Sequence, residues 1–159
     1  MSLRLRPFTE DDLPEIAGIE AASFSDVWPD TFFMYNYRKA PELLLVAEDD
    51  QGILGYVVGE IREAMFSGRS YMSKMGHILN IAVNPERRKR GVGTRLMAEI
   101  ETRFREAEAT QVTLEVRESN TGAQGFYKGR GFSEIGRVSA YYNNEDAIVM
   151  CKTFGKDIC

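Results

Sequence analysis

The stretch that decides the fold is Gly76-His77-Ile78-Leu79-Asn80-Ile81-Ala82-Val83-Asn84-Pro85-Glu86-Arg87-Arg88-Lys89-Arg90-Gly91-Val92-Gly93-Thr94. Its first half is short and apolar and predicts a buried β-strand that ends near Val83. Its second half is a basic turn with two glycines that opens a helix predicted from about Gly91 to Ala107. Such a turn exposes unpaired backbone N–H groups at the positive end of the helix dipole. We therefore interpret it as a cradle for an anion, and specifically for a pyrophosphate.

Two familiar phosphate loops do not fit this turn. The chain has no G-x-x-x-x-G-K-[ST], and Gly91-Val92-Gly93-Thr94-Arg95-Leu96 has leucine where a dinucleotide fold needs its third glycine. Arg88-x-x-Gly91-x-Gly93 instead resembles the acyl-CoA loop, [RQ]-x-x-G-x-[GA], of the GNAT acetyltransferases. The alternative is that the basic residues are only the solvated face of a helix entry.

A second, longer pattern follows: Leu114-Glu115-Val116-Arg117-Glu118-Ser119-Asn120-Thr121-Gly122-Ala123-Gln124-Gly125-Phe126-Tyr127-Lys128-Gly129-Arg130-Gly131-Phe132. It resembles the L-E-V-R-x-S-N-x-x-A-x-x-x-Y-x-x-x-G-F signature of GNAT enzymes that acetylate protein N-termini, such as the ribosomal-protein-alanine and archaeal enzymes. The two motifs cover roughly the last half of the chain. The resemblance implies an α/β fold with a mixed sheet of about seven strands, four helices, and a central parallel pair splayed around the CoA site.

Composition limits the alternatives. The 159 residues are enough for one domain, residues 1–159, and 43% hydrophobic with 28% charged residues is ordinary for a globular protein. A net charge of −4 argues against a broad nucleic-acid surface, so the basic turn is expected to hold one small anion. No segment has the length or apolarity of a signal peptide or a membrane span.

The chain carries two cysteines, Cys151 and Cys159, and a single histidine. This content supports neither a metal site such as zinc nor a disulfide scaffold. We therefore expect a reducing, cytoplasmic location, with no membrane and no nucleic acid among the partners.

The first half of the chain predicts helices and an antiparallel hairpin. A short strand at residues 3–6 is followed by a helix that ends near Ala22 and a loop over 23–30. A second helix, rich in aromatic residues, covers 30–39. Strands at 43–48 and 53–61 are joined by a turn and should be antiparallel, and the polar stretch 63–75 is expected to be a mobile loop.

The second half predicts a crossover. A strand at 111–117 follows the helix after the basic turn, so it should lie parallel to the strand at 76–83. A short helix at 121–128, a strand at 132–138, a turn at 139–144 with two tyrosines and a final strand at 146–153 complete the chain. The site is expected at the C-terminal ends of the parallel pair.

The resemblance implies roles for particular residues. Backbone groups of the central strand would bind the pantetheine arm, the basic turn would bind the pyrophosphate, and one asparagine would hold the cofactor arm. The cofactor-binding residues are then Ile81, Ala82, Val83, Arg88, Lys89, Arg90, Gly91, Val92, Gly93, Thr94, Asn120 and Tyr127. Tyr127 would also be the proton donor beside the thioester sulfur. Glu115 matches the general base, and His77 could share that role through a water.

Substrate contacts are implied at two places. Tyr141 and Tyr142 match a pair that contacts the backbone of the acceptor peptide. Phe24, Trp28 and Asp30 lie where related enzymes read the first substrate residue. The aromatic residues around them could instead be core, and Asp30 could be an ordinary helix cap.

The chemistry favours an α-amine as the acceptor. An α-amine with a pKa near 8 is about 10% neutral at pH 7, whereas a lysine with a pKa near 10.4 is less than about 0.1% neutral. A modest base such as Glu115 or His77 therefore suffices. In the alternative, Glu115 pairs with an arginine, His77 is structural and Tyr127 only packs.

The favoured hypothesis is an acetyl-CoA-dependent N-acetyltransferase that modifies a protein or peptide N-terminus by direct attack in a ternary complex. No covalent intermediate is expected, because neither cysteine lies near the motifs. One alternative is a lysine or small-amine acetyltransferase with the same cofactor site, and another is a non-catalytic acyl-CoA-binding module. The oligomeric expectation is a monomer or a weak homodimer.

Overall fold

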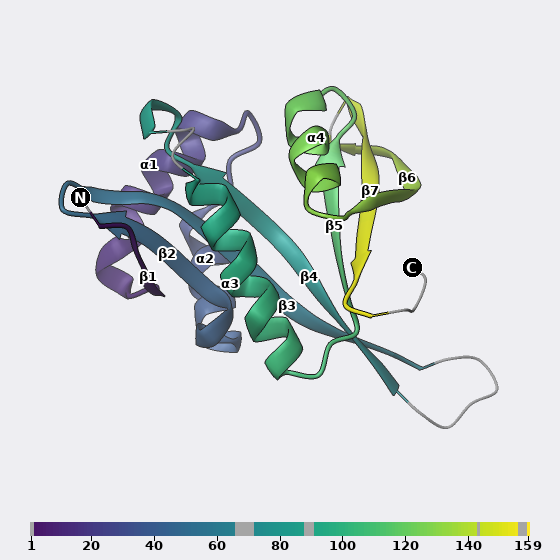
Figure 1. Ribbon diagram of the computed structural model, residues 1–159. Helices are drawn as coiled ribbons and strands as arrows, with labels where there is room; N and C mark the ends of the chain where they lie inside the picture. Colours follow the sequence, from purple (N-terminus) through teal and green to yellow (C-terminus); the bar gives the residue numbers. More distant parts are fainter. Residues whose placement is uncertain (1, 66–71, 88–90, 143, 156–158) are drawn as a thin grey trace. The chain divides into compact units, whose positions relative to one another are not determined.

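The computed structural model describes residues 2–65, 72–87, 91–142, 144–155 and 159 (Figure 1). Over these residues the helices are α1 (Leu13–Ser23), α2 (Asp30–Lys39), α3 (Val92–Glu106) and α4 (Thr121–Gly129). The strands are β1 (Arg4–Pro7), β2 (Leu44–Asp49), β3 (Gly52–Met65), β4 (Met72–Val83), β5 (Gln111–Arg117), β6 (Ser133–Tyr142) and β7 (Glu145–Thr153). Three 3₁₀ turns, η1 (Glu10–Asp12), η2 (Pro41–Leu43) and η3 (Pro85–Arg87), complete the described elements.

The strands follow the order β1-β2-β3-β4-β5-β7-β6 in one mixed sheet. β2 and β3 are antiparallel, and β4 and β5 are parallel over the register Met75↔Gln111 to Ile78↔Leu114. Both relations confirm the prediction from sequence. The mixed α/β class is therefore confirmed.

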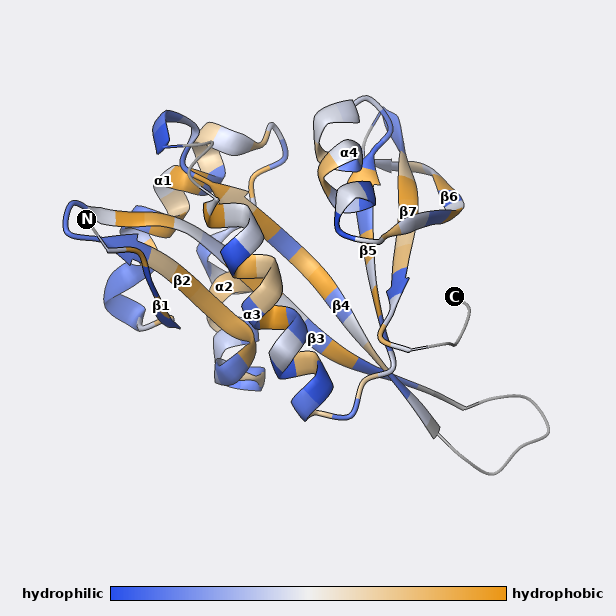
Figure 2. Ribbon diagram, in the orientation of Figure 1, coloured by the Kyte–Doolittle hydropathy of each residue, from blue (hydrophilic) through white to orange (hydrophobic). Residues whose placement is uncertain are grey.

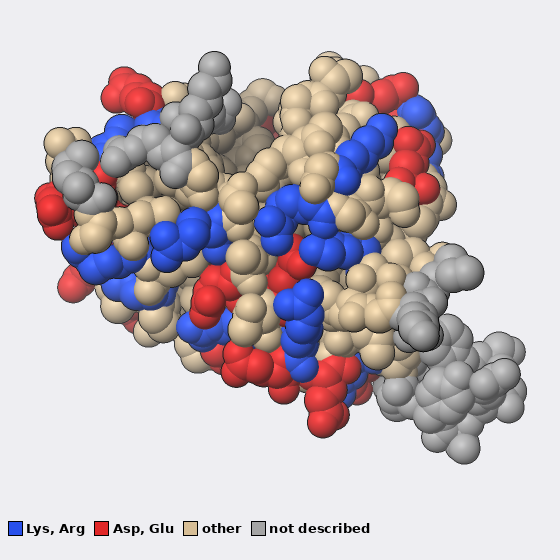
Figure 3. All heavy atoms as spheres, in the orientation of Figure 1, with Lys and Arg blue, Asp and Glu red and all other residues tan. Residues whose placement is uncertain are grey.

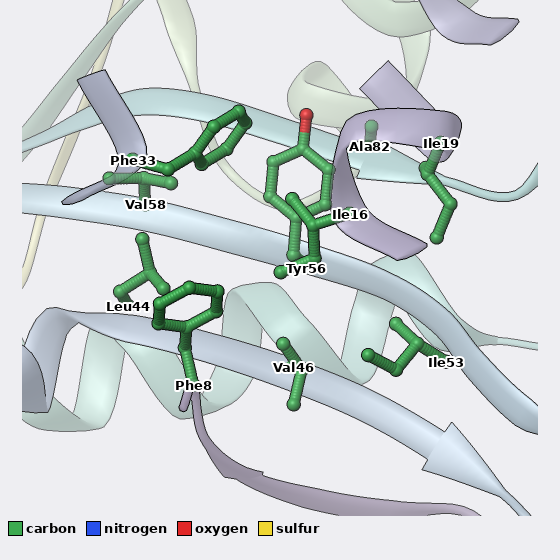
Figure 4. Packing of buried hydrophobic residues seen from close by; sticks show 10 residues of the cluster. All are labelled: Phe8, Ile16, Ile19, Phe33, Leu44, Val46, Ile53, Tyr56, Val58 and Ala82. Atoms are coloured by element: carbon green, nitrogen blue, oxygen red, sulfur yellow. The ribbon is translucent and has the colours of Figure 1, made fainter. Parts of the chain in front are cut away.

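The chain divides into two compact units, one of residues 1–60 and 79–103 and the other of residues 61–78 and 104–159. In the first unit α1 and α2 pack on one face of β2 and β3, and hydrophobic residues run along β2 (Figures 1 and 2). The core of this face is drawn in Figure 4 and consists of Phe8, Ile16, Ile19, Phe33, Leu44, Val46, Ile53, Tyr56, Val58 and Ala82. These residues hold the N-terminal helices to the sheet.

Helix α3 forms as its period predicts. Val92, Leu96 and Ile100 are buried, and they recur every four residues along one face. A Cβ atom built on Gly55 of β3 would lie 3.3 Å from Leu96, while its neighbour Tyr56 points into the core beneath α1 and α2. Since successive side chains of a strand point to opposite faces, α3 covers the face opposite to α1 and α2.

The second unit has a tight contact of its own between Gly76 of β4 and Phe104. A Cβ atom built on Gly76 would lie 2.4 Å from ring atoms of Phe104, which is fully buried. Only glycine fits at this position of β4, because any larger side chain would displace the ring. Gly76 lets the ring of Phe104 pack directly on the backbone of β4.

Two predicted loops are wrong in part. The stretch 63–75 was expected to be a loop, but β3 extends to Met65 and β4 begins at Met72, while residues 66–71 lie outside the described residues. The turn expected at 139–144 is shorter, because β6 continues to Tyr142, which pairs with Glu145 of β7. Ladder hydrogen bonds carry a strand past the point where its apolar pattern stops.

The expectation of no disulfide is also wrong. Cys151 and Cys159 are bonded to each other, with their Cα atoms 6.0 Å apart. Cys151 is a buried residue of β7, and the chain returns to it within eight residues. A spacing of this kind carries no sequence signal, because pairing depends on where the last residues turn. The bond removes the cysteine argument for a reducing compartment.

The surface charges are mixed. On the face drawn in Figure 3, Lys and Arg side chains lie among Asp and Glu side chains rather than apart from them. None of the helices in the described part of the chain is both long enough and apolar enough to span a membrane.

Candidate functional site

The basic turn follows β4 through η3 and leads into α3 within the first unit. Arg88, Lys89 and Arg90, three of the expected pyrophosphate ligands, lie outside the described residues. Gly91 has a φ of +75°, and its carbonyl accepts a hydrogen bond from the Arg95 N–H at 3.0 Å. A positive φ favours glycine, so the sequence requirement at this position is conformational. The N–H groups of the first helical turn, including Val92, Gly93 and Thr94, precede this bond and can bind an anion.

A partly buried ion pair anchors the beginning of this turn. The guanidinium of Arg87 contacts the carboxylate of Asp49, whose side chain is 1% exposed. Asp49 also accepts a hydrogen bond from the Gln51 N–H at 2.8 Å. The sequence pattern indicates Asp49 only as part of a hairpin turn, so it did not predict that Asp49 holds the residue before the basic turn.

The end of β4 approaches β3 closely. A Cβ atom on Gly55 would lie 2.7 Å from the carbonyl oxygen of Ala82, and the N–H of Asn84 donates to the carbonyl of Leu54 at 2.7 Å. The side chain of Ala82 belongs to the core, so any contact from this residue to a cofactor would use its backbone. Ile81 and Val83, its neighbours, are partly buried.

The expected catalytic residues His77 and Glu115 are in direct contact in the second unit. His77 Nε2 lies 2.7 Å from Glu115 Oε2, and His77 Nδ1 lies 2.6 Å from Thr113 Oγ1. The parallel register places His77 opposite Thr113, and Glu115 follows two positions later on the same face of β5. The side chain of His77 is 3% exposed and that of Glu115 is 18% exposed. The carboxylate is thus the member of this cluster that a substrate can reach.

Hydrogen-bond chemistry fixes the protons in this cluster. An ionised carboxylate only accepts hydrogen bonds, so when His77 is neutral its Nε2 carries the proton and donates a hydrogen bond to Glu115. Nδ1 is then an acceptor, and the hydroxyl of Thr113 donates to it. Thr113 was not expected from the sequence, although its position two residues before Glu115 could have indicated a shared face.

Tyr127 is the buried aromatic residue of α4. Its ring makes edge contacts with Phe126 at 5.4 Å and Phe132 at 5.8 Å between centroids. Burial raises the pKa of the Tyr127 phenol above its ordinary value, and the nearby Tyr142 adds to the rise. The phenol therefore stays protonated, which suits a hydrogen-bond donor.

Tyr141 and Tyr142, the pair expected to contact the acceptor peptide, lie at the end of β6. Their rings contact edge to face at 4.9 Å, and Tyr141 is 52% exposed. Burial, followed by the neighbouring Tyr141 and Glu115, raises the pKa of Tyr142 to about 12. Arg117 lies over the ring of Tyr142 at 4.2 Å and bonds Glu145 at 3.0 Å. Arg117 therefore orients one of the two tyrosines, although the sequence pattern indicated it only as part of the second motif.

Asn120 has a structural use. It is the N-cap of α4, and its side-chain oxygen accepts a hydrogen bond from the Ala123 N–H at 3.0 Å. A helix cap is a frequent role for asparagine, and the exposed carboxamide still has its NH₂ end to offer.

The segment between α1 and α2 contributes more to the core than its sequence suggested. Phe24 and Trp28 are partly buried and pack against the core of the first unit. Trp28 makes edge or tilted contacts with Phe32 and Phe33, each at 5.5 Å. Asp30 is exposed and is the first residue of α2, after Pro29 as N-cap, so it does not cap the helix.

Within the second unit the fold thus gathers five expected residues, which are His77, Glu115, Tyr127, Tyr141 and Tyr142. The rings of Tyr141 and Tyr142 are 4.9 Å apart, Glu115 contributes to the raised pKa of both, and Tyr142 contributes to the raised pKa of Tyr127. A carboxylate with an adjacent imidazole can accept a proton, and buried phenols can donate hydrogen bonds. The expected substrate residues Phe24, Trp28 and Asp30 belong to the first unit.

Known proteins resemble this chain in sequence and in structure. The profile of the Acetyltransferase (GNAT) family matches residues 13–132. An uncharacterized N-acetyltransferase of Methanocaldococcus jannaschii is 33% identical over 150 residues, which cover 93% of this chain and 90% of that protein. An N-alpha-acetyltransferase of Sulfurisphaera tokodaii is 33% identical over 152 residues, which cover 92% and 90%. The crystal structure of Chaetomium thermophilum Naa20 in complex with a bisubstrate analogue has a TM-score of 0.85 at 33% identity, covering 94% of this chain and 86% of that one.

Proposed function

Because this chain belongs to the GNAT acetyltransferase family, we propose that it transfers the acetyl group of acetyl-CoA to the α-amino group at the N-terminus of a protein or peptide. The observation that carries this proposal is the cluster in which Thr113 contacts His77 and His77 contacts Glu115, a partly exposed base that lies near two tyrosines. We further propose that the two compact units make up one acetyltransferase domain of residues 1–159.

The residues after β4 fit the diphosphate of coenzyme A. Gly91 has a positive φ and open space around the position of a Cβ atom, and it is followed at once by the N-terminus of α3. Backbone N–H groups at such a terminus, with Thr94 beside them, bind phosphate oxygens. Arg88, Lys89 and Arg90 supply positive charge in the same sequence segment. When bound, acetyl-CoA supplies an activated acetyl thioester, and the chain supplies the groups that deliver the amine to it.

Glu115 acts as the general base. It takes a proton from the α-ammonium group, either directly or through one water, and so produces the neutral amine that can attack. The N–H of His77 donates to the same carboxylate and holds it in place. Because an α-amine is already about 10% neutral at pH 7, a carboxylate base is sufficient for this acceptor.

Tyr127 acts as a hydrogen-bond donor to the sulfur that leaves. An ordinary phenol has a pKa near 10 and an ordinary thiol one near 8.5, so complete proton transfer from phenol to thiolate is unfavourable by roughly 1.5 pKa units. Burial raises the pKa of Tyr127 and widens the difference. The expectation that Tyr127 is a full proton donor is therefore replaced by electrostatic stabilisation of the developing thiolate.

Tyr141 and Tyr142 bind the backbone of the acceptor. Both phenols keep their protons near neutral pH, because burial raises the pKa of each. They can donate hydrogen bonds to peptide carbonyls, and such contacts suit an extended N-terminal segment better than a small amine.

A peptide panel tests the function. Peptides with free N-termini are incubated with acetyl-CoA beside the same peptides with blocked N-termini and an internal lysine, and mass spectrometry locates the acetyl group. We expect modification of the free N-termini and loss of at least about 100-fold in kcat for Glu115→Gln. Acetylation of lysine alone, or of neither group, would overturn the proposal. Glu118→Gln, a neighbouring exposed glutamate, is the matched control and should keep its kcat.

A further inference from the structure

One buried carboxylate has no part in the mechanism above. Glu20 lies near the end of α1 and is 0% exposed. Its Oε2 accepts a hydrogen bond from the Trp28 N–H at 2.9 Å. Its Oε1 accepts from Asn80 Nδ2 at 2.6 Å and from the hydroxyl of Tyr56. Glu20 thus ties the segment between α1 and α2 to strands β3 and β4, and all of these residues belong to the first unit.

Stability alone is a weak reason for such a group. Removing a carboxylate from water costs several kcal/mol, and well-packed apolar residues often stabilise a core equally well. A carboxylate does offer several acceptor sites, so it can hold donors from different elements in one fixed arrangement. Here the three donors come from a loop, from β3 and from β4. The arrangement is therefore better explained by the position that it imposes on the loop.

The hydrogen bond to Glu20 holds the backbone amide of Trp28, a residue with a large side chain. The indole of Trp28 packs against Phe32 and Phe33, each at 5.5 Å, and Phe33 packs on Tyr56 at 5.4 Å. Figure 4 shows Tyr56 beside Phe33, with its hydroxyl as the single oxygen atom among the side chains drawn. A shift of the Trp28 amide would move the indole and loosen this aromatic contact.

We propose that residues 24–30 receive the first residue of the substrate, as the resemblance implies, and that Glu20 is a positioning residue for this acceptor, because by holding the Trp28 amide it sets the shape of that segment. The inference rests on the proposed function, because only an acceptor that enters beside this loop would be affected. Asn80, which shares the carboxylate, immediately precedes Ile81, so the loop is tied to the strand segment assigned to the cofactor arm.

The test uses Glu20→Gln and the sole tryptophan of the chain. Glutamine has one acceptor oxygen and places an NH₂ group where the other carboxylate oxygen accepted, so the arrangement that holds all three donors is broken with little change in volume. We expect a shifted Trp28 emission in the free protein and a rise of about tenfold in KM for the acceptor peptide, with KM for acetyl-CoA within about twofold. Glu15→Gln, on the same helix but bonded to the Ile53 N–H, is the matched control and should leave both readouts unchanged.

A second measurement needs no variant. In the wild-type protein without substrate, hydrogen exchange of the Trp28 amide should be slowed at least about tenfold relative to an unprotected amide, because that N–H is bonded to a buried acceptor. Rapid exchange of the Trp28 amide, or an unshifted emission in Glu20→Gln, would show that Glu20 does not hold this amide in place. A shifted emission with an unchanged peptide KM would overturn its role in acceptor binding. A wild-type protein that acetylates no peptide would instead overturn the proposed function, and the exchange and emission data would still decide whether Glu20 holds the amide.

Discussion

Thr113→Val is the substitution that most directly examines the cluster around Glu115. Valine has nearly the shape of threonine, so the change replaces one hydroxyl by a methyl group on β5. The hydroxyl donates to His77 Nδ1 at 2.6 Å, and His77 is 2% exposed. The variant therefore leaves a ring nitrogen in the interior without that donor.

The magnitude follows from that burial. A buried polar group that loses its hydrogen-bond partner costs about 1 to 3 kcal/mol. We expect a fall of about 1 to 2 kcal/mol in the free energy of unfolding, since the added methyl offsets part of the cost, which is roughly 2 to 8 °C in Tm for a chain of this size. The kcat should fall as well, because the imidazole that holds Glu115 is no longer fixed.

Urea denaturation in a double-mutant cycle isolates the contact. Thr113→Val is measured in the wild type and in a His77→Leu background, where the ring nitrogen is absent. The cost should vanish in the second background, which gives a coupling energy of about 1 to 2 kcal/mol. An equal cost in both backgrounds would show that the hydroxyl does not serve His77, and the proton assignment of the cluster would be wrong.

Three further predictions concern other parts of the fold. Tyr127→Phe should lower kcat by about 100-fold in steady-state assays with little change in stability, and a kcat within about twofold of wild type would contradict its role as a donor. Gly76→Ala should cost about 1 to 3 kcal/mol in urea denaturation, because the new Cβ would lie 2.4 Å from Phe104, and Phe104→Leu should recover part of this loss. The Arg6 hydrogen bond lowers the pKa of Asp12 below 3.8, so its stabilisation is present above that value and is lost as the pH falls through the lowered pKa. Asp12→Asn should therefore be less stable at pH 7 and should lose less stability than the wild type on acidification, as measured by unfolding at a series of pH values.

The elements whose pattern is local could be predicted from the sequence. The strand Gln111–Arg117 and the helix Asp30–Lys39 lie at the predicted bounds, because alternation and an abrupt change of composition mark both ends. The pairing of His77 with Glu115 was expected only as two residues of one site. Their direct contact depends on the register of β4 and β5, which no local pattern specifies.

The misplaced features depend on contacts between distant segments. The polar residues of 63–75 suggested a loop, whereas pairing with a neighbouring strand extends β3 and β4 into that stretch. The network of Glu20 joins residues up to 60 positions apart, and the bond between Cys151 and Cys159 requires the path of the last residues. Such features become visible only when the chain is folded.

The burial of the Tyr127 phenol also determines how slowly electrophilic reagents modify this residue. Iodination and nitration consume the phenolate form, and a group whose pKa is raised by burial offers little of it. Under mild conditions such reagents would thus label the exposed ring of Tyr35 and spare Tyr127, the residue proposed to stabilise the leaving group.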